Sequence, residues 1–319
     1  MDRRMTIPNC LLHGLRVPVI AAPMFLISTP DLVVECCRNG VIGTFPALNQ
    51  RTTEGYDVWL TEISERLASS PGGAAFGVNL VAHRSNARLA ADLEVTKMHR
   101  VPLVITSLGI DPELIETVHG YGGLVFHDVT TVKFAERAIA AGVDGLIAVS
   151  HGAGAHAGAI NPFALVAEIR SIWEGPLALG GAITNGAQVA AARMMGVDFA
   201  YVGTRFLATP ESSAQAGHRD MILRATVEDI SLSRGVSGLP ANFLRESLAA
   251  AGLDPNDLGP SAERNFGTTG NLKPWRDIWA AGQGVGSISD LPPTGEICIR
   301  LAQEYENALE LSERLKLKF

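Results

Sequence analysis

The stretch that decides the fold covers residues 145–181 and reads GLIAVSHGAGAHAGAINPFALVAEIRSIWEGPLALGG. It begins and ends with short apolar runs, 145–150 and 176–181, which are typical of strands buried on both faces. A loop rich in Gly and Ala follows the first run. A helical pattern over 162–173 then begins with Pro162 at its first position. Strand, helix and strand in this order predict a βαβ unit with two parallel strands.

The same alternation repeats along the first two thirds of the chain. Apolar runs predict eight strands, at residues 18–24, 41–46, 74–80, 102–109, 123–129, 145–150, 176–181 and 199–204. Helical patterns lie between them, at residues 29–40, 54–68, 85–97, 111–119, 130–141, 162–173 and 185–195. Seven βα units and an eighth strand predict an α/β protein with a TIM (β/α)8 barrel. A doubly wound open sheet is the alternative, but the repeated turns AAGVD and MMGVD favour the barrel.

The alternation of predicted strands and helices ends after the eighth strand. Residues 211–275 read as helices with polar loops and carry no strong strand signal, whereas residues 295–317 read as one long helix. We therefore expect a barrel formed by residues 1–210 and 276–319. A small, mainly helical insertion domain, residues 211–275, would cap its mouth, and the last helix would return to complete the outer ring.

Composition narrows the class of protein. The chain has 319 residues, of which 47% are hydrophobic, enough for a full globular core. A net charge of −7 gives no basic footprint for nucleic acid or an anionic membrane. Neither a run of about 18 apolar residues nor a secretory signal is evident. The four cysteines (Cys10, Cys36, Cys37 and Cys298) have no C-x-x-C spacing. They read as buried, reduced thiols of a cytoplasmic protein, and we expect no metal site.

Two glycine-containing loops end the last two predicted strands. LGGAITNG, residues 179–186, follows the seventh strand, and VGTRFLATPE, residues 202–211, follows the eighth. In barrel enzymes these two loops commonly bind phosphate. Glycine lets backbone N–H groups approach such a ligand closely. Both loops together predict a phosphate-bearing ligand; for either loop alone, a tight turn is the alternative.

The ends of the first and third strands suggest what else the ligand carries. They read AAPM, residues 21–24, and GVNL, residues 77–80. Close backbone and the amide of Asn79 suit the hydrogen-bonding edge of a flat isoalloxazine ring, on which Met24 would pack. Core filling by Met24 and a turn cap by Asn79 are the alternatives.

The loop SHGAGAHAG, residues 150–158, admits two interpretations. From Gly152 it fits G-x-G-x-x-A, close to a dinucleotide-binding fingerprint. That fingerprint opens a helix in an N-terminal βαβ unit with an acidic residue about 20 positions on, and no such unit is evident here. We interpret the stretch as a thin catalytic loop that presents His156 as a general base near its ordinary pKa of about 6.5. His151 reads either as its partner or as a surface residue.

Six motifs together resemble the nitronate monooxygenase family, formerly called 2-nitropropane dioxygenases. They are PVIAAPM, FGVNL, AVSHGAGAHAG, LGGAITNG, YVGTRFLATPES and WRDIWAAGQGVGSI, spread over most of the chain in the expected order. Members are FMN-dependent TIM-barrel enzymes. Enoyl reductases and NADH:quinone reductases with FMN barrels share much of this pattern.

The resemblance implies FMN as cofactor and a role for each matching residue. His156 would be the catalytic base. The cofactor would contact Ala22, Pro23 and Met24 along the flavin, Asn79 at the ring or ribityl chain, Gly180, Gly181, Gly203 and Thr204 at the phosphate, Gln283 from the C-terminal segment, and also His127, Ser150 and Gly154. Trp275 and Trp279 either line the pocket mouth or anchor a helix to the barrel.

The implied reaction is oxidative denitrification of alkyl nitronates or nitroalkanes with O2, giving a carbonyl compound and nitrite. The alternative is NAD(P)H-dependent reduction of quinones or enoyl thioesters by the same flavin. We expect small-molecule partners only, and a homodimer stays open.

Two positions depart from the family pattern. Gly152 stands where many members carry an acidic residue, and His127-Asp128 ends the fifth strand where some carry a cationic or amide side chain. A carboxylate at Asp128 would disfavour an anionic reduced flavin, because like charges repel at short range. Either His127 takes the role of the cationic or amide side chain, or Asp128 points away from the flavin.

Overall fold

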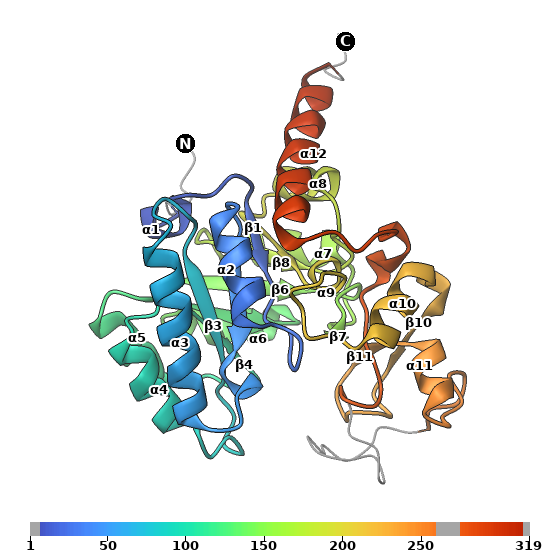
Figure 1. Cartoon of the computed structure of the whole chain (residues 1–319), viewed down its shortest axis with the longest axis horizontal. Coiled ribbons are helices and arrows are strands. Elements are labelled where there is room, and N and C mark those ends of the chain that lie inside the picture. The colour runs from blue at the N-terminus through green and yellow to red at the C-terminus, as the bar shows by residue number, and fades with distance from the viewer. Residues whose placement is uncertain (1–6, 260–274, 315–319) are drawn as a thin grey trace.

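Eight parallel strands close into a barrel in the order β1-β2-β3-β4-β5-β6-β8-β9 (Figure 1). The structure is a computed structural model and describes residues 7–259 and 275–314. The strands are β1 (Val19–Ala21), β2 (Ile42–Pro46), β3 (Phe76–Val81), β4 (Leu103–Ser107), β5 (Leu124–Val129), β6 (Gly145–Val149), β8 (Leu177–Gly180) and β9 (Phe199–Val202). Pairing of β1 with β9 closes the ring. The predicted TIM barrel is confirmed, and the open sheet is wrong.

Helices surround the barrel. They are α2 (Pro30–Arg38), α3 (Thr53–Ala68), α4 (Leu89–Met98), α5 (Pro112–Gly120), α6 (Val132–Ala140), α7 (Pro162–Ile172), α8 (Gly186–Met194) and α12 (Thr294–Arg314), with the short α1 (Asn9–Leu12), η1 (Ala47–Asn49) and α9 (Thr204–Leu207). As predicted, α12 completes the ring between α8 and α2. A Cβ at Gly186 would collide with the α12 backbone, so glycine permits this close approach. The far end of α12 extends away from the barrel (Figure 1).

Alternate residues of each strand face opposite sides of the barrel wall. One set fills the interior: Ile20, Ile42, Leu103, Ile105, Phe126, Ile147, Ala178 and Phe199. Phe126 and Phe199 meet there with ring centroids 6.5 Å apart. Residues of the other set, such as Val125 and Val129, pack against the helices. Side chains alternate along each strand, so every second residue faces the interior; we call residues of one such set residues of the same parity. This parity also decides which residues face the mouth of the barrel.

The segment after β9 contains strands as well as helices. It forms α10 (Ala216–Arg224), η2 (Val227–Asp229), β10 (Ile230–Ser233), β11 (Ala241–Leu244) and α11 (Arg245–Ala250). β10 and β11 pair antiparallel, and β7 (Ala155–His156) from the barrel loop adds a third strand. The expectation of no strands there is therefore wrong, because strands of two to four residues give too little periodicity to detect. The domain limits at 210 and 276 stay a prediction, and residues 260–274 lie outside the described residues.

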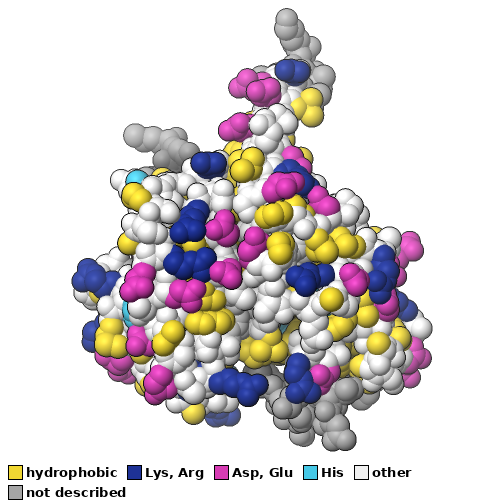
Figure 2. Space-filling model, viewed as in Figure 1, with side chains coloured by type: hydrophobic (Ala, Val, Ile, Leu, Met, Phe, Trp, Pro, Cys, Tyr) yellow, Lys and Arg dark blue, Asp and Glu magenta, His cyan; other side chains and the backbone are white. Residues whose placement is uncertain are grey.

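The distribution of charged side chains and the state of the cysteines can be compared with the predictions from composition. Figure 2 shows acidic and basic side chains interspersed over the visible face. The four cysteines are free, as predicted; Cys36, Cys37 and Cys298 are buried, but Cys10 is exposed. In the described part of the chain, no helix is long and apolar enough to cross a membrane. The same residues hold no cluster of His, Cys, Asp and Glu suited to a metal ion.

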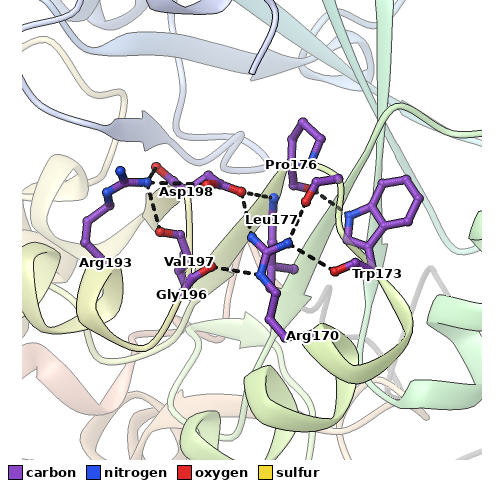
Figure 3. Close-up of polar contacts among 9 residues, drawn as sticks. Arg170, Trp173, Pro176, Leu177, Arg193, Gly196, Val197 and Asp198 are labelled. Atoms are coloured by element: carbon purple, nitrogen blue, oxygen red, sulfur yellow. Dashed lines mark hydrogen bonds and ion pairs between the residues drawn. The ribbon is translucent and has the colours of Figure 1, made fainter. Parts of the chain in front are cut away.

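A carboxylate fixes the end of the barrel opposite the mouth (Figure 3). Asp198, just before β9, accepts hydrogen bonds from Arg170 at 2.6 Å and from the Leu177 N–H at 2.9 Å. Arg170 also donates to the Gly196 carbonyl at 2.8 Å, and Arg193 lies 3.4 Å from the other Asp198 oxygen. These contacts join α7, α8, β8 and β9 at the N-terminal ends of the strands. At this end of a TIM barrel such contacts support stability rather than chemistry.

Replacing Asp198 by Ala should lower the free energy of unfolding by about 3 kcal/mol, because two guanidinium groups and one N–H lose their acceptor. Urea denaturation measures this loss. Glu94→Ala is the control, since Glu94 is exposed in a 3.6 Å pair with Lys97 and should leave stability unchanged. Equal losses in both variants would contradict the assigned role of Asp198.

Candidate active site

The residues that follow β1 lie beside Gly203 at the barrel mouth. A Cβ added at Gly203 would lie 3.8 Å from Ala22 Cβ and 3.8 Å from Met24 Sδ, with no nearer atom outside its own neighbours. Pro23, between these two residues, is half-buried. Met24 also packs against the barrel and insertion cores, so it fills core as well as bordering the site. A flat ring would find apolar contacts and an uncrowded backbone here.

Asn79 is nearly buried on β3 and faces the mouth. Its Nδ2 donates to the Ile105 carbonyl and to Ser107 Oγ, both at 3.1 Å. The expected alternative, a turn cap, is wrong, because the amide bridges β3 and β4 instead. With its nitrogen fixed by β4, Asn79 presents its carbonyl oxygen as the group that a ligand can use.

The predicted phosphate residues lie at the ends of two strands, β8 and β9, and neighbouring segments hold both places. Gly181 has φ +135°, and any Cβ there would collide with Ser150 Oγ, which itself donates to the Gly180 carbonyl at 2.8 Å. Thr204 Oγ1 accepts from the Gly282 N–H at 2.9 Å, which leaves its own hydroxyl proton to donate. The structure therefore places glycine backbone beside small hydroxyl side chains, a donor set that suits an anion.

One carbonyl oxygen joins these loops. Gly152 accepts from the Ala182 N–H at 3.1 Å and from the Gln283 N–H at 3.0 Å. Gly154 packs so closely on Gly282 that a Cβ would lie 2.8 Å from its nitrogen. The glycine pattern that resembled a dinucleotide fingerprint thus serves close contact between loops.

Gln283 begins η3 (Gln283–Ser287), and its Nε2 lies 3.1 Å from His151 Nδ1. His151 is therefore tied to the C-terminal segment. A cavity of about 370 Å³ lies beside this contact. It is lined by Ser150, His151, Gly152, Ala159, Asn161, Pro162, Gly181, Ala182 and Gln283. Three of the predicted cofactor residues share that cavity.

His156 lies in a strand rather than in a bare loop. It forms β7 with Ala155 and pairs with Ala241 of β11. Its ring meets Trp275 edge-on, with centroids 5.1 Å apart, and Trp275 stacks on Phe243 at 5.3 Å. Trp275 thus contacts His156, whereas Trp279 stacks on His218 of α10.

Burial sets the charge of His156. Desolvation lowers the pKa of its imidazole to about 4. The expectation of an ordinary pKa is therefore wrong, because the insertion covers the ring. The imidazole is neutral at neutral pH, the form that accepts a proton.

Asn242 of β11 fixes the loop that carries His156, and the sequence analysis missed it. The side chain is fully buried and donates to the carbonyls of His151 at 2.8 Å and Ala153 at 2.6 Å. Between them and His156, Ala155 has φ +56°, a left-handed conformation that costs a residue with a Cβ about 1 kcal/mol or more. The Asn242 bonds and the β7–β11 pairing hold this strained turn.

The two residues near the end of β5 that depart from the family pattern, His127 and Asp128, face opposite sides of the barrel wall. His127 lies on the helix-facing side, where its Nδ1 is 2.7 Å from Thr106 Oγ1, and burial lowers its pKa to about 4. Asp128 shares the inward parity of Leu124 and Phe126. The structure does not bring His127 to the mouth with the other predicted residues. It brings Asp128 there, together with Tyr201 of β9.

A closed barrel whose C-terminal end carries a neutral histidine, glycine loops and polar groups defines a TIM-barrel enzyme. Residues 9–304 match the sequence profile of the family described as nitronate monooxygenase. The chain belongs to the nitronate monooxygenase family, and it is a flavin-dependent oxidoreductase.

Individual relatives agree with this assignment. The nitronate monooxygenase of Paraburkholderia phytofirmans is 25% identical, with 94% of this chain and 95% of that protein covered. The Rv1533 protein of Mycobacterium tuberculosis is 34% identical over 48% of this chain, but the match spans only 41% of that protein.

Solved structures share the fold. FabK from Thermotoga maritima has a TM-score of 0.78 at 21% identity, covering 97% of this chain and 99% of that one. Nitroalkane oxidase from Streptomyces ansochromogenes has a TM-score of 0.74 at 24% identity, covering 93% of this chain and 97% of that one.

Replacing Asn242 by Ala should loosen the loop before His156, because two buried carbonyls lose their donor. We expect a loss of about 1–3 kcal/mol in unfolding free energy. We also expect faster hydrogen exchange of the Ala157 N–H, which donates to Pro240. Asn256→Ala, in an exposed loop of the insertion, is the matched control. Unchanged exchange at Ala157 in Asn242→Ala would show that Asn242 does not hold the loop.

Proposed function

We propose that the protein binds FMN and catalyses the oxidative denitrification of nitroalkanes or alkyl nitronates, with His156 as the general base and O2 as oxidant. The neutral imidazole of His156, held by β11 beside the glycine loops, is the observation that carries the proposal. Family membership supports the reaction class.

The residues at the mouth fit FMN. Ala22 and Met24, which lie beside Gly203, would offer apolar contacts to a flat ring. An Oδ1 of Asp128 is buried without a hydrogen-bond partner among the described residues. Gly180, Gly181, Gly203 and Thr204, with Ser150 and Gly154 nearby, would hold the phosphate. When bound, FMN supplies the electron transfer between substrate and O2.

The chain itself would manage the proton and exclude water. The nitro group acidifies the α-carbon of a nitroalkane, and a His156 ring nitrogen would take that proton. Trp275 packs edge-on against this imidazole and Phe243 stacks on Trp275, so the proposed proton acceptor would work in a partly dry, apolar environment. Because the imidazole is neutral, proton removal from a neutral nitroalkane suits it better than pairing with an anionic nitronate.

His156→Asn and His156→Ala should keep FMN but lose turnover. With a neutral nitroalkane, we expect a decrease of about 10²–10⁴-fold in kcat, the usual contribution of a general base. With a preformed nitronate, which needs no proton removal, the decrease should be smaller. Oxygen uptake and nitrite release measure both reactions.

The control for these variants is His119→Ala. His119 is exposed on α5 and contacts Asp144, so its loss should leave turnover unchanged. Near-normal nitroalkane turnover in the His156 variants would rule out His156 as the base. Bleaching of the flavin by NADH under anaerobic conditions, without nitronate turnover, would instead favour the NAD(P)H-dependent reductase.

The pH profile tests the state of His156 directly. Burial lowers the pKa of this base to about 4, so its active, neutral form prevails above that pH. For a neutral nitroalkane, kcat/KM should therefore fall on acidification only as pH approaches about 4. An acid limb near the ordinary histidine pKa of about 6.5 would show that the ring is solvated in the working enzyme.

A further inference from the structure

The inner wall of the barrel carries one carboxylate at its mouth. Along β5, Leu124 and Phe126 belong to the interior, and Asp128 follows with the same parity. Along β9, Phe199 and Tyr201 face the same interior. Asp128 and Tyr201 thus lie nearer the mouth than the Phe126–Phe199 contact, toward the C-terminal ends of β5 and β9, two strands that β6 and β8 separate in the barrel.

Asp128 has no counter-charge in this layer. Its Oδ1 is buried and unpartnered among the described residues. Burial raises the pKa of its carboxyl to about 7, and the charge of Asp128 helps to raise the pKa of Tyr201. From the other strands, the side chains of the same parity near the mouth are uncharged: Ala22, Thr44, Asn79, Ser107, Val149, Gly180 and Gly203. Tyr201 is therefore the only titratable group among these described neighbours, and it is neutral.

We propose that Asp128 sets the reduction potential of the bound flavin, because its carboxylate opposes negative charge on the reduced cofactor. This inference rests on the proposed binding of FMN at the mouth. Uptake of two electrons and one proton converts oxidised flavin into an anionic reduced form, and a second proton makes that form neutral. A nearby uncompensated carboxylate disfavours the anion, so it lowers the potential.

The charge of Asp128 makes the effect depend on pH. Above pH 7 the carboxylate is ionised, and reduction places a second negative charge in the same poorly solvated layer. Below its pKa of about 7 the carboxyl is neutral, and the opposition disappears. The reduction potential of the flavin should therefore depend on the charge of Asp128 and not on the shape of its side chain.

The experiment is a reduction of the FMN-loaded protein with dithionite in the presence of a reference dye, followed by absorbance. Well above pH 7, Asp128→Asn should favour the reduced cofactor at least tenfold. For a two-electron couple this is a positive shift of about 30 mV. At a pH well below the carboxyl titration, the variant and the wild-type protein should converge. Asp128→Ala should shift the potential in the same direction.

Asp144→Asn is the matched control. Asp144 precedes β6 at the opposite end of the barrel, where it accepts from the Val125 N–H at 2.8 Å. This variant should leave the potential unchanged. Removing the unpaired charge at Asp128 should also raise thermal stability above pH 7, which a merely supporting carboxylate would not do.

Three outcomes decide between the proposals. Potentials of both Asp128 variants equal to that of the wild-type protein would overturn the role of Asp128 while the proposed function stands. Loss of FMN from both variants would also overturn the role of Asp128, because this residue would then be needed to bind the oxidised and the reduced cofactor equally. Failure of the wild-type protein to bind FMN would overturn the proposed function, and the role of Asp128 with it.

Discussion

Pairing of β1 with β9 is the interaction on which the rest of the structure depends. It converts a row of parallel strands into a closed ring, so that inward side chains meet across the axis, as Phe126 and Phe199 do. The same closure brings the C-terminal ends of all eight strands to one rim. Without it, Asp128 on β5 and Tyr201 on β9 would be far apart.

A second pairing, between β7 and β11, completes the site. It attaches two residues of a barrel loop to the insertion, and Asn242 reinforces it from β11. The effect on His156 is both geometric and electrostatic. The ring is held in one place, and its burial keeps it neutral. The contacts of Asp198 fix the opposite end of the barrel, away from these residues.

Sequence reasoning predicted the barrel because each strand is apolar on both faces and each helix has its own start and stop signals, such as Thr29 and Gly40 around α2. It could not predict β7, because two residues have no periodicity and their partner strand lies far along the chain. Nor could it predict the pKa of His156, which depends on that partner. The alternation of side chains along a strand predicts that His127 and Asp128 face opposite sides of β5. It does not predict which of them faces inward, because the residues before them are apolar on both faces.

The sheet formed by β7, β10 and β11 has a mechanical consequence. The insertion cannot swing away from the barrel as a rigid cover, because its central strand is hydrogen-bonded to the residue pair that includes His156. Any opening wide enough to separate them would have to break this ladder and release His156, the proposed proton acceptor, at the same time. Local unfolding of the insertion would therefore also free His156 from the strand that holds it.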